Sequence, residues 1–123
     1  MSGPFYAGSL TAGGAIAAGD FVYNNSGSLA KLTSDTGVVL GIATRALESG
    51  DQALGLVSDT NTPCWVTLAS GVNPSPGAFL SAGSSGATVS ASGDVRHAQV
   101  VAAPTAAGKP ALCKLWLEGS LVP

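Results

Sequence analysis

The sequence predicts an all-β protein, a compact β-sandwich or β-barrel of short antiparallel strands with an extended N-terminal arm. Three observations favour this fold class. Glycine, serine, threonine or proline interrupts nearly every window in which apolar residues could recur with helical spacing. Short segments alternate between apolar and polar residues instead. Repeated glycine-containing turns separate these segments.

The chain divides into a flexible N-terminal arm, residues 1–18, and one β domain, residues 19–123. The arm carries no charged side chain, and several glycines separate its few larger residues. A segment of this composition is expected to gain order when a partner binds it. Its candidate binding residues are Pro4, Phe5, Tyr6, Leu10 and Ile16.

Several segments of the domain predict strands. Residues 21–23 and 29–33 flank a turn-forming Asn-Asn-Ser-Gly-Ser stretch, which indicates a hairpin. Residues 37–47 are rich in apolar and β-branched side chains and predict a long strand. Residues 64–69 and 112–118 alternate between two faces with a period of two, the pattern of a half-buried strand.

A recurring turn pattern centres on four glycines, Gly19, Gly50, Gly77 and Gly93. In three of the four, aspartate is the next residue. Glycine supplies the positive φ that a tight turn requires, and an aspartate side chain accepts hydrogen bonds from nearby backbone N–H groups. The spacing of these turns predicts many short antiparallel strands.

Composition excludes several classes of partner. Only 10% of the residues are charged, against about 25% in an average protein, and the formal net charge is -2. This chain lacks the basic surface with which proteins bind nucleic acid or anionic membranes. No apolar run approaches the roughly 18 residues that span a bilayer. No secretory signal precedes the domain, so we expect synthesis in a cytoplasm.

The chain offers little material for catalysis. Its only histidine, His97, follows Ser92 and Asp94, but a catalytic triad depends on tertiary geometry and an oxyanion site. We expect a structural histidine and a protein that is not an enzyme. Cys64 and Cys113 lack the paired spacing of zinc ligands, so no metal or cofactor is expected. The two cysteines could pair, although free buried thiols are favoured in a reducing compartment.

The two tryptophans, Trp65 and Trp116, are candidate interface aromatics. Aromatic residues are enriched at subunit contacts, which favours this interpretation. A sugar-stacking platform formed together with Tyr6 and Tyr23 is the alternative. A mean hydropathy of +0.37 further predicts apolar surface that is used as an interface with another protein.

The sequence resembles the small capsid decoration (cement) proteins of tailed bacteriophages. The likeness lies in "AGGAIAAGDFVYNNSGSLAKLT", "GVVLGIATRALESGDQALGLVS" and "WVTLASGV". The family shares a Gly/Ala-rich arm, G-D-x-V, a short hairpin, a V-x-G-I-A strand and a later G-D/E turn. The correspondence covers roughly residues 12–80, whereas residues 74–101 match no family pattern.

The resemblance implies a compact, β-tulip-like domain that forms a homotrimer on the outer surface of an expanded phage head. There it would bridge neighbouring major capsid protein subunits and stabilise the shell, with the arm contacting the capsid. The implied location is the outer surface of the virion, after synthesis in the host cytoplasm, and no catalytic residue is implied. The alternative is a viral surface or tail-associated β-domain that binds host glycans.

Overall fold

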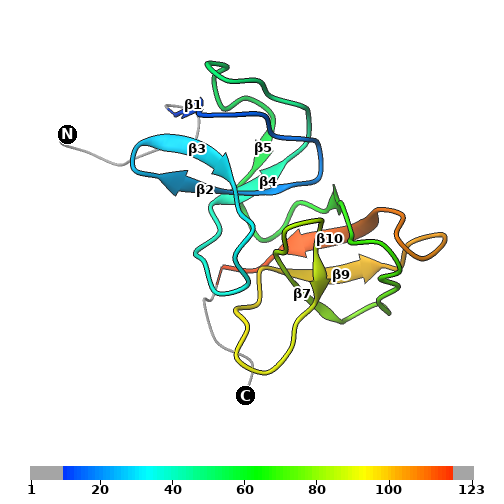
Figure 1. The fold of residues 1–123 in the computed structure, drawn as a ribbon. Helices are drawn as coiled ribbons and strands as arrows, with labels where there is room; N and C mark the ends of the chain where they lie inside the picture. Colours follow the sequence, from blue (N-terminus) through cyan, green and yellow to red (C-terminus); the bar gives the residue numbers. More distant parts are fainter. Residues whose placement is uncertain (1–9, 118–123) are drawn as a thin grey trace.

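The computed structural model describes residues 10–117, and these residues form two five-stranded β-sheets (Figure 1). The predicted all-β class is confirmed: the described residues contain no helix, and one sheet curls into a half-barrel. The strands are β1 (Thr11–Ala12), β2 (Phe21–Asn25), β3 (Ser28–Lys31), β4 (Gly41–Ala43), β5 (Leu56–Val57), β6 (Cys64–Val66), β7 (Phe79–Ser81), β8 (Thr88–Val89), β9 (Ala98–Ala102) and β10 (Ala111–Leu115).

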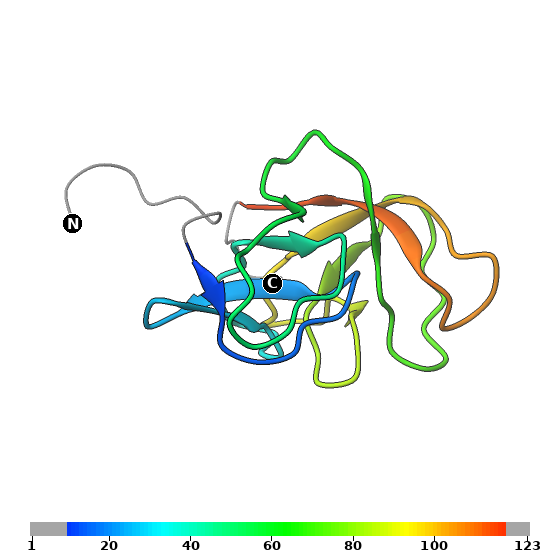
Figure 2. The ribbon, with the colours of Figure 1, turned by 90° about the horizontal axis from the view of Figure 1, so that it is seen from above.

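The two sheets correspond to two successive halves of the chain. The first half, residues 10–57, forms the sheet β1-β3-β2-β4-β5, and the second half, residues 64–117, forms the sheet β6-β10-β9-β7-β8. Neighbouring strands are antiparallel, as predicted, except that β1 runs parallel to β3. In Figure 2, the loop that follows β5 and joins the halves stands out from the body of the molecule.

The halves repeat one arrangement of four strands. β3-β2-β4-β5 in the first sheet matches β8-β7-β9-β10 in the second, with every pairing antiparallel. Backbone hydrogen bonds repeat as well. The N–H of Leu32 donates to the carbonyl of Phe21 at 2.8 Å, and that of Ser90 donates to Phe79 at 2.9 Å. Equivalent positions in the two halves can therefore be compared directly.

The four predicted glycine turns share one geometry. Gly19, Gly50, Gly77 and Gly93 have φ of 90, 91, 88 and 88°. In each turn the residue after glycine donates its N–H to the carbonyl three residues earlier, at 3.0 to 3.2 Å. A glycine with φ near +80° at the third position is the signature of a type II turn. At all three aspartates the carboxylate accepts the N–H three residues earlier, at 2.8 to 2.9 Å.

Two further turns of this kind escaped prediction. Gly71 and Gly108 have φ of 80 and 77°, and the residues after them donate to Ala69 and Ala106, each at 3.1 Å. Neither glycine is followed by aspartate, as Gly19, Gly50 and Gly93 are, and neither was included in the predicted pattern. Glycine at the third position of the turn was the signal that could have found them.

The predicted hairpin is confirmed as β2 and β3. Its two-residue turn consists of Ser26 and Gly27, both with positive φ, which matches the twist of an antiparallel pair. The predicted long strand over residues 37–47 is wrong, because only Gly41–Ala43 pair as β4. Val38 is 85% exposed, and the loop that carries it instead places Gly37 against the second half.

A hydrophobic core joins the halves into one unit. Its members come from both sheets, and the fully buried Ile42 of the first half lies in the same cluster as Val66, Leu80 and Leu115 of the second. Each such side chain contributes about 1.5 to 3 kcal/mol on burial. The alternation predicted for residues 64–69 and 112–118 is confirmed within β6 and β10, whose inward residues are buried.

Residues 10–18 belong to the folded domain, which corrects the expectation that the arm extends to residue 18. Leu10 and Ile16 are 3% and 2% exposed and pack in a second hydrophobic cluster of the first half. The Ile16 N–H donates to the carbonyl of Leu47 at 2.9 Å. Small residues permit this close packing: a Cβ on Gly13 would lie 3.2 Å from that of Ser28. Pro4, Phe5 and Tyr6 lie outside the described residues.

Candidate functional site: a groove between the halves

An open groove of about 420 Å³ runs along the junction of the two halves. The first half contributes the turn before β2 and the end of β4. The second half contributes the edge strand β6, its preceding proline, and the residue before β10. We call this groove the junction groove. Its main lining residues are Ala18, Gly19, Thr44, Pro63, Trp65 and Pro110.

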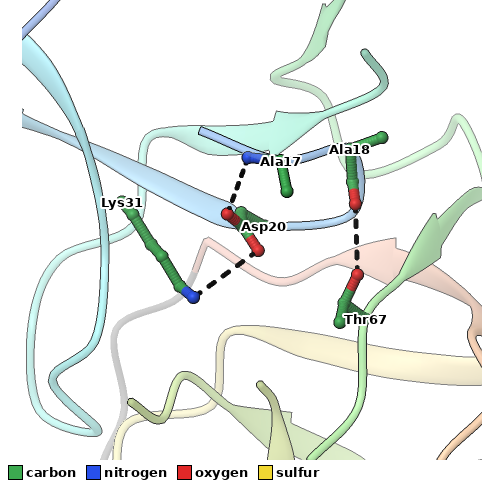
Figure 3. A network of polar contacts seen from close by, with 5 residues as sticks. All are labelled: Ala17, Ala18, Asp20, Lys31 and Thr67. Carbon is green, nitrogen blue, oxygen red and sulfur yellow. Dashed lines mark hydrogen bonds and ion pairs between the residues drawn. The ribbon is translucent and has the colours of Figure 1, made fainter. Parts of the chain in front are cut away.

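Thr67 ties the two walls of the junction groove together. Its hydroxyl donates to the carbonyl of Ala18 at 3.1 Å (Figure 3). Its N–H donates to the carbonyl of Gly19 at 3.0 Å. A Cβ on Gly19 would lie 2.9 Å from the Thr67 nitrogen, so this close approach requires glycine. The equivalent turn glycine of the second half, Gly77, has no atom within 4 Å of such a Cβ.

Asp20 holds the turn that presents Ala18 and Gly19 to the groove. One carboxylate oxygen accepts the Ala17 N–H at 2.9 Å, and the other lies 3.9 Å from the Lys31 ammonium (Figure 3). Asp20 is itself buried, and a buried carboxylate needs such partners to offset its lost hydration. The sequence predicted the turn but not its use as one wall of a groove.

The chemistry of the junction groove is apolar and uncharged. Trp65 is 59% exposed beside two prolines, and within residues 10–117 no Asp, Glu, Lys, Arg or His lines the groove. The hydroxyls of Thr44 and Thr67 already donate to backbone carbonyls, of Gly55 and Ala18 respectively. This arrangement suits an apolar, uncharged surface or segment of a partner better than a ligand that needs many hydrogen bonds.

Trp116, the second candidate interface aromatic, lies in a different hollow from Trp65. Its ring packs edge-on against Phe79, with 4.8 Å between centroids and 74° between planes. Its indole nitrogen is buried and finds no hydrogen-bond partner among the described residues. The exposed Val38 lines the same hollow, of about 140 Å³. Tyr23 packs against the core, so these aromatics do not share one sugar-stacking surface.

His97 is fully buried, and its two ring nitrogens bond to backbone groups of different halves, Ala82 in its own half and Gly37 in the first. Nδ1 accepts the Ala82 N–H at 2.9 Å, so Nε2 carries the proton and donates to the carbonyl of Gly37 at 2.7 Å. The ring also packs against Phe21 of the first half, 5.6 Å between centroids. Asp94 accepts the Ala91 N–H within its own turn. His97 and Asp94 therefore hydrogen-bond to backbone groups and not to each other.

Burial lowers the pKa of His97, against smaller opposing effects of its bond to Gly37 and of Asp35 and Asp94. Above the unfolded pKa of about 6.5, histidine is neutral in both states and contributes its full stability. As the pH falls below that value, the unfolded chain binds a proton that the folded chain resists. We expect the free energy of unfolding to fall by up to about 1.4 kcal/mol per pH unit between pH 6.5 and 5.

Urea unfolding of wild-type protein and the His97→Gln variant at pH 5 to 7.5 checks this pH dependence. Glutamine does not titrate, so its curve should be flatter, although the variant is less stable overall. The Thr62 N–H is the main cause of a lowered pKa at Asp59. Any loss of stability from protonation of this carboxylate therefore occurs at lower pH than the loss from His97. A wild-type curve as flat as the variant's would contradict the assignment of a neutral histidine.

Cys64 and Cys113 are both free and buried, in agreement with the favoured interpretation of the sequence. Burial raises the pKa of the Cys64 thiol to about 11, with the charge of Asp59 adding to the effect. Burial likewise raises the pKa of the Cys113 thiol to about 12. Both thiols are protonated at neutral pH. The sequence did not indicate that β6 and β10 place the two cysteines side by side.

Within residues 10–117 no three His, Cys, Asp or Glu side chains gather closely enough to hold a metal ion. The same residues contain no helix long and apolar enough to cross a membrane. Fold and groove together define a two-sheet β domain with an apolar groove at the junction of its halves. No known family model matches the chain, and a search of curated proteins found no significant relative.

Proposed function

We propose that this chain is a structural virion protein, a capsid decoration or cement protein of a tailed bacteriophage. It binds the outer surface of the head, bridges neighbouring major capsid protein subunits and stabilises the shell. The single observation that carries the proposal is the junction groove, an uncharged apolar surface with an exposed tryptophan on a rigid β scaffold. The sequence resemblance supplies the identity of the partner.

Two properties of the chain support a protein partner. Only 10% of the residues are charged, so an interface would bury few unpaired charges. The contacts of Thr67 with Ala18 and Gly19 hold the two walls of the groove together before binding. A preorganised surface binds with less loss of conformational entropy. Self-association as a homotrimer on the shell is part of the proposal.

Trp65→Ala is expected to weaken binding to decoration-free heads by about 30-fold, the effect of losing an aromatic residue that contributes about 2 kcal/mol to an interface. Because Trp65 is mostly exposed, the variant should retain the fold and near wild-type thermal stability. Co-sedimentation with heads of the phage that carries this chain measures the binding. The matched control is Val89→Ala, exposed on β8 at the opposite edge of the second sheet. Equal binding by both variants would exclude the groove.

Glycan binding at Trp65 is the second candidate, because an exposed aromatic ring beside a groove can stack on a sugar. The scarcity of free polar groups in the groove weighs against it. A glycan array separates the two functions. A defined glycan that binds wild-type protein but not Trp65→Ala, combined with no binding to heads, would replace the decoration proposal.

A further inference from the structure

We propose that Cys64 and Cys113 form an oxidation site, at which the two thiols join in a disulfide between β6 and β10 when a low-molecular-weight disulfide is present. The two residues are direct partners in the antiparallel register of these strands. Both are free and buried. This inference stands on the pairing of the strands and does not depend on the proposed function.

The strand geometry meets the requirements of a disulfide. Directly opposite residues of an antiparallel pair point to the same face with Cα atoms about 4.5 to 5.5 Å apart. A disulfide accepts Cα separations of about 4.4 to 6.8 Å. Among the described strands β6 pairs with β10 alone, and the β9–β10 register shifts between Leu112 and Cys113. The backbones of β6 and β10 can therefore shift slightly where the disulfide would form.

Access sets the order in which the thiols react. Cys64 lines the junction groove, whereas Cys113 is fully buried behind it. The Cys64 thiolate attacks one sulfur of oxidised glutathione, forming a mixed disulfide and releasing one glutathione thiolate, which takes up a proton. The deprotonated Cys113 then attacks the Cys64 sulfur, and the second glutathione leaves as its thiol. Two protein thiols are oxidised, and one glutathione disulfide is reduced to two thiols.

The bond would fasten the edge strand β6 to the interior of the second sheet. It closes a loop that contains β7, β8 and β9, and a disulfide of this span constrains the unfolded chain strongly. Under the proposed function, the chain would carry thiols in the host cytoplasm and acquire the bond after release into oxidising surroundings. Shell proteins outside the cell would benefit from the added stability.

Incubation of the full chain with oxidised glutathione at pH 7, 8 and 9 tests the inference. We expect both thiols to disappear together, as one intramolecular disulfide by mass spectrometry, without any change in oligomeric state. Because the attacking species is a thiolate with a pKa of about 11, the rate should rise about tenfold per pH unit. The Tm should rise on the order of 10 °C and return on reduction with dithiothreitol.

Single-cysteine variants provide the controls. Cys113→Ser should stop at a stable mixed disulfide on Cys64, whereas Cys64→Ser should react far more slowly at the buried Cys113. Three results would overturn the inference: wild-type protein that carries glutathione on each cysteine separately, cross-linked dimers only, or thiols that stay free after a day at pH 9. An oxidised form with a lower Tm would contradict the stabilising role.

Discussion

Replacement of His97 by alanine is expected to lower the free energy of unfolding by about 4 kcal/mol, a large part of the total for a domain of this size. The substitution removes a fully buried ring and leaves a cavity at the junction of the halves. It also leaves the buried Ala82 N–H and the partly buried Gly37 carbonyl without their partner. Each such loss costs about 1 to 3 kcal/mol.

Urea denaturation followed by tryptophan fluorescence measures the effect of His97→Ala. The matched control is Gln99→Ala on the same segment, whose side chain donates to the carbonyl of Gly77 from a partly exposed position. That control should cost less than about 1.5 kcal/mol, the net value of one hydrogen bond. A His97→Ala variant as stable as the control would show that the contact between halves contributes little.

Gly19→Ala is expected to destabilise the protein by about 3 kcal/mol or more, because two penalties combine at one position. A φ of 90° is strained for any residue with a Cβ. The added methyl would also collide with the backbone and side chain of Thr67 across the junction groove. Relief of that collision requires the walls of the groove to separate.

Gly77→Ala is the natural control, because the internal repeat places the same turn in open space. Its φ of 88° imposes the same strain, but its Cβ would meet nothing within 4 Å. We expect a loss of about 1 to 2 kcal/mol there. The difference between the two variants, read from urea midpoints, isolates the contact between the halves. If both variants lost the same free energy of unfolding, Thr67 would be able to move away from the added methyl group without cost.

Local turn chemistry was the most informative feature of the sequence. The four glycine turns, the hairpin at residues 21–31 and the two faces of β6 followed from residue types alone, since these features depend on near neighbours in the chain. The predicted strand at residues 37–47 was wrong for a tertiary reason. Its first residues form a loop that delivers Gly37 to His97, a contact between distant parts of the chain.

The candidate site was harder to predict because it lies between the halves. Trp65 was proposed as an interface residue, and its exposure agrees with that role without testing the partner. No sequence pattern predicted that Thr67 and Pro110 would line the same groove as Ala18 and Gly19. Leu10 and Ile16 were assigned to a binding arm because their neighbours are small and uncharged. The same small neighbours allow this segment to pack tightly into the first half.

The most direct test of the central claim is an electron-microscopy map of decoration-free heads incubated with this chain. The proposed function predicts density for the two-sheet domain on the outer surface, in contact with neighbouring capsid subunits, with the junction groove facing the shell. Heads that remain bare at saturating protein, while the chain stays folded in solution, would contradict the claim.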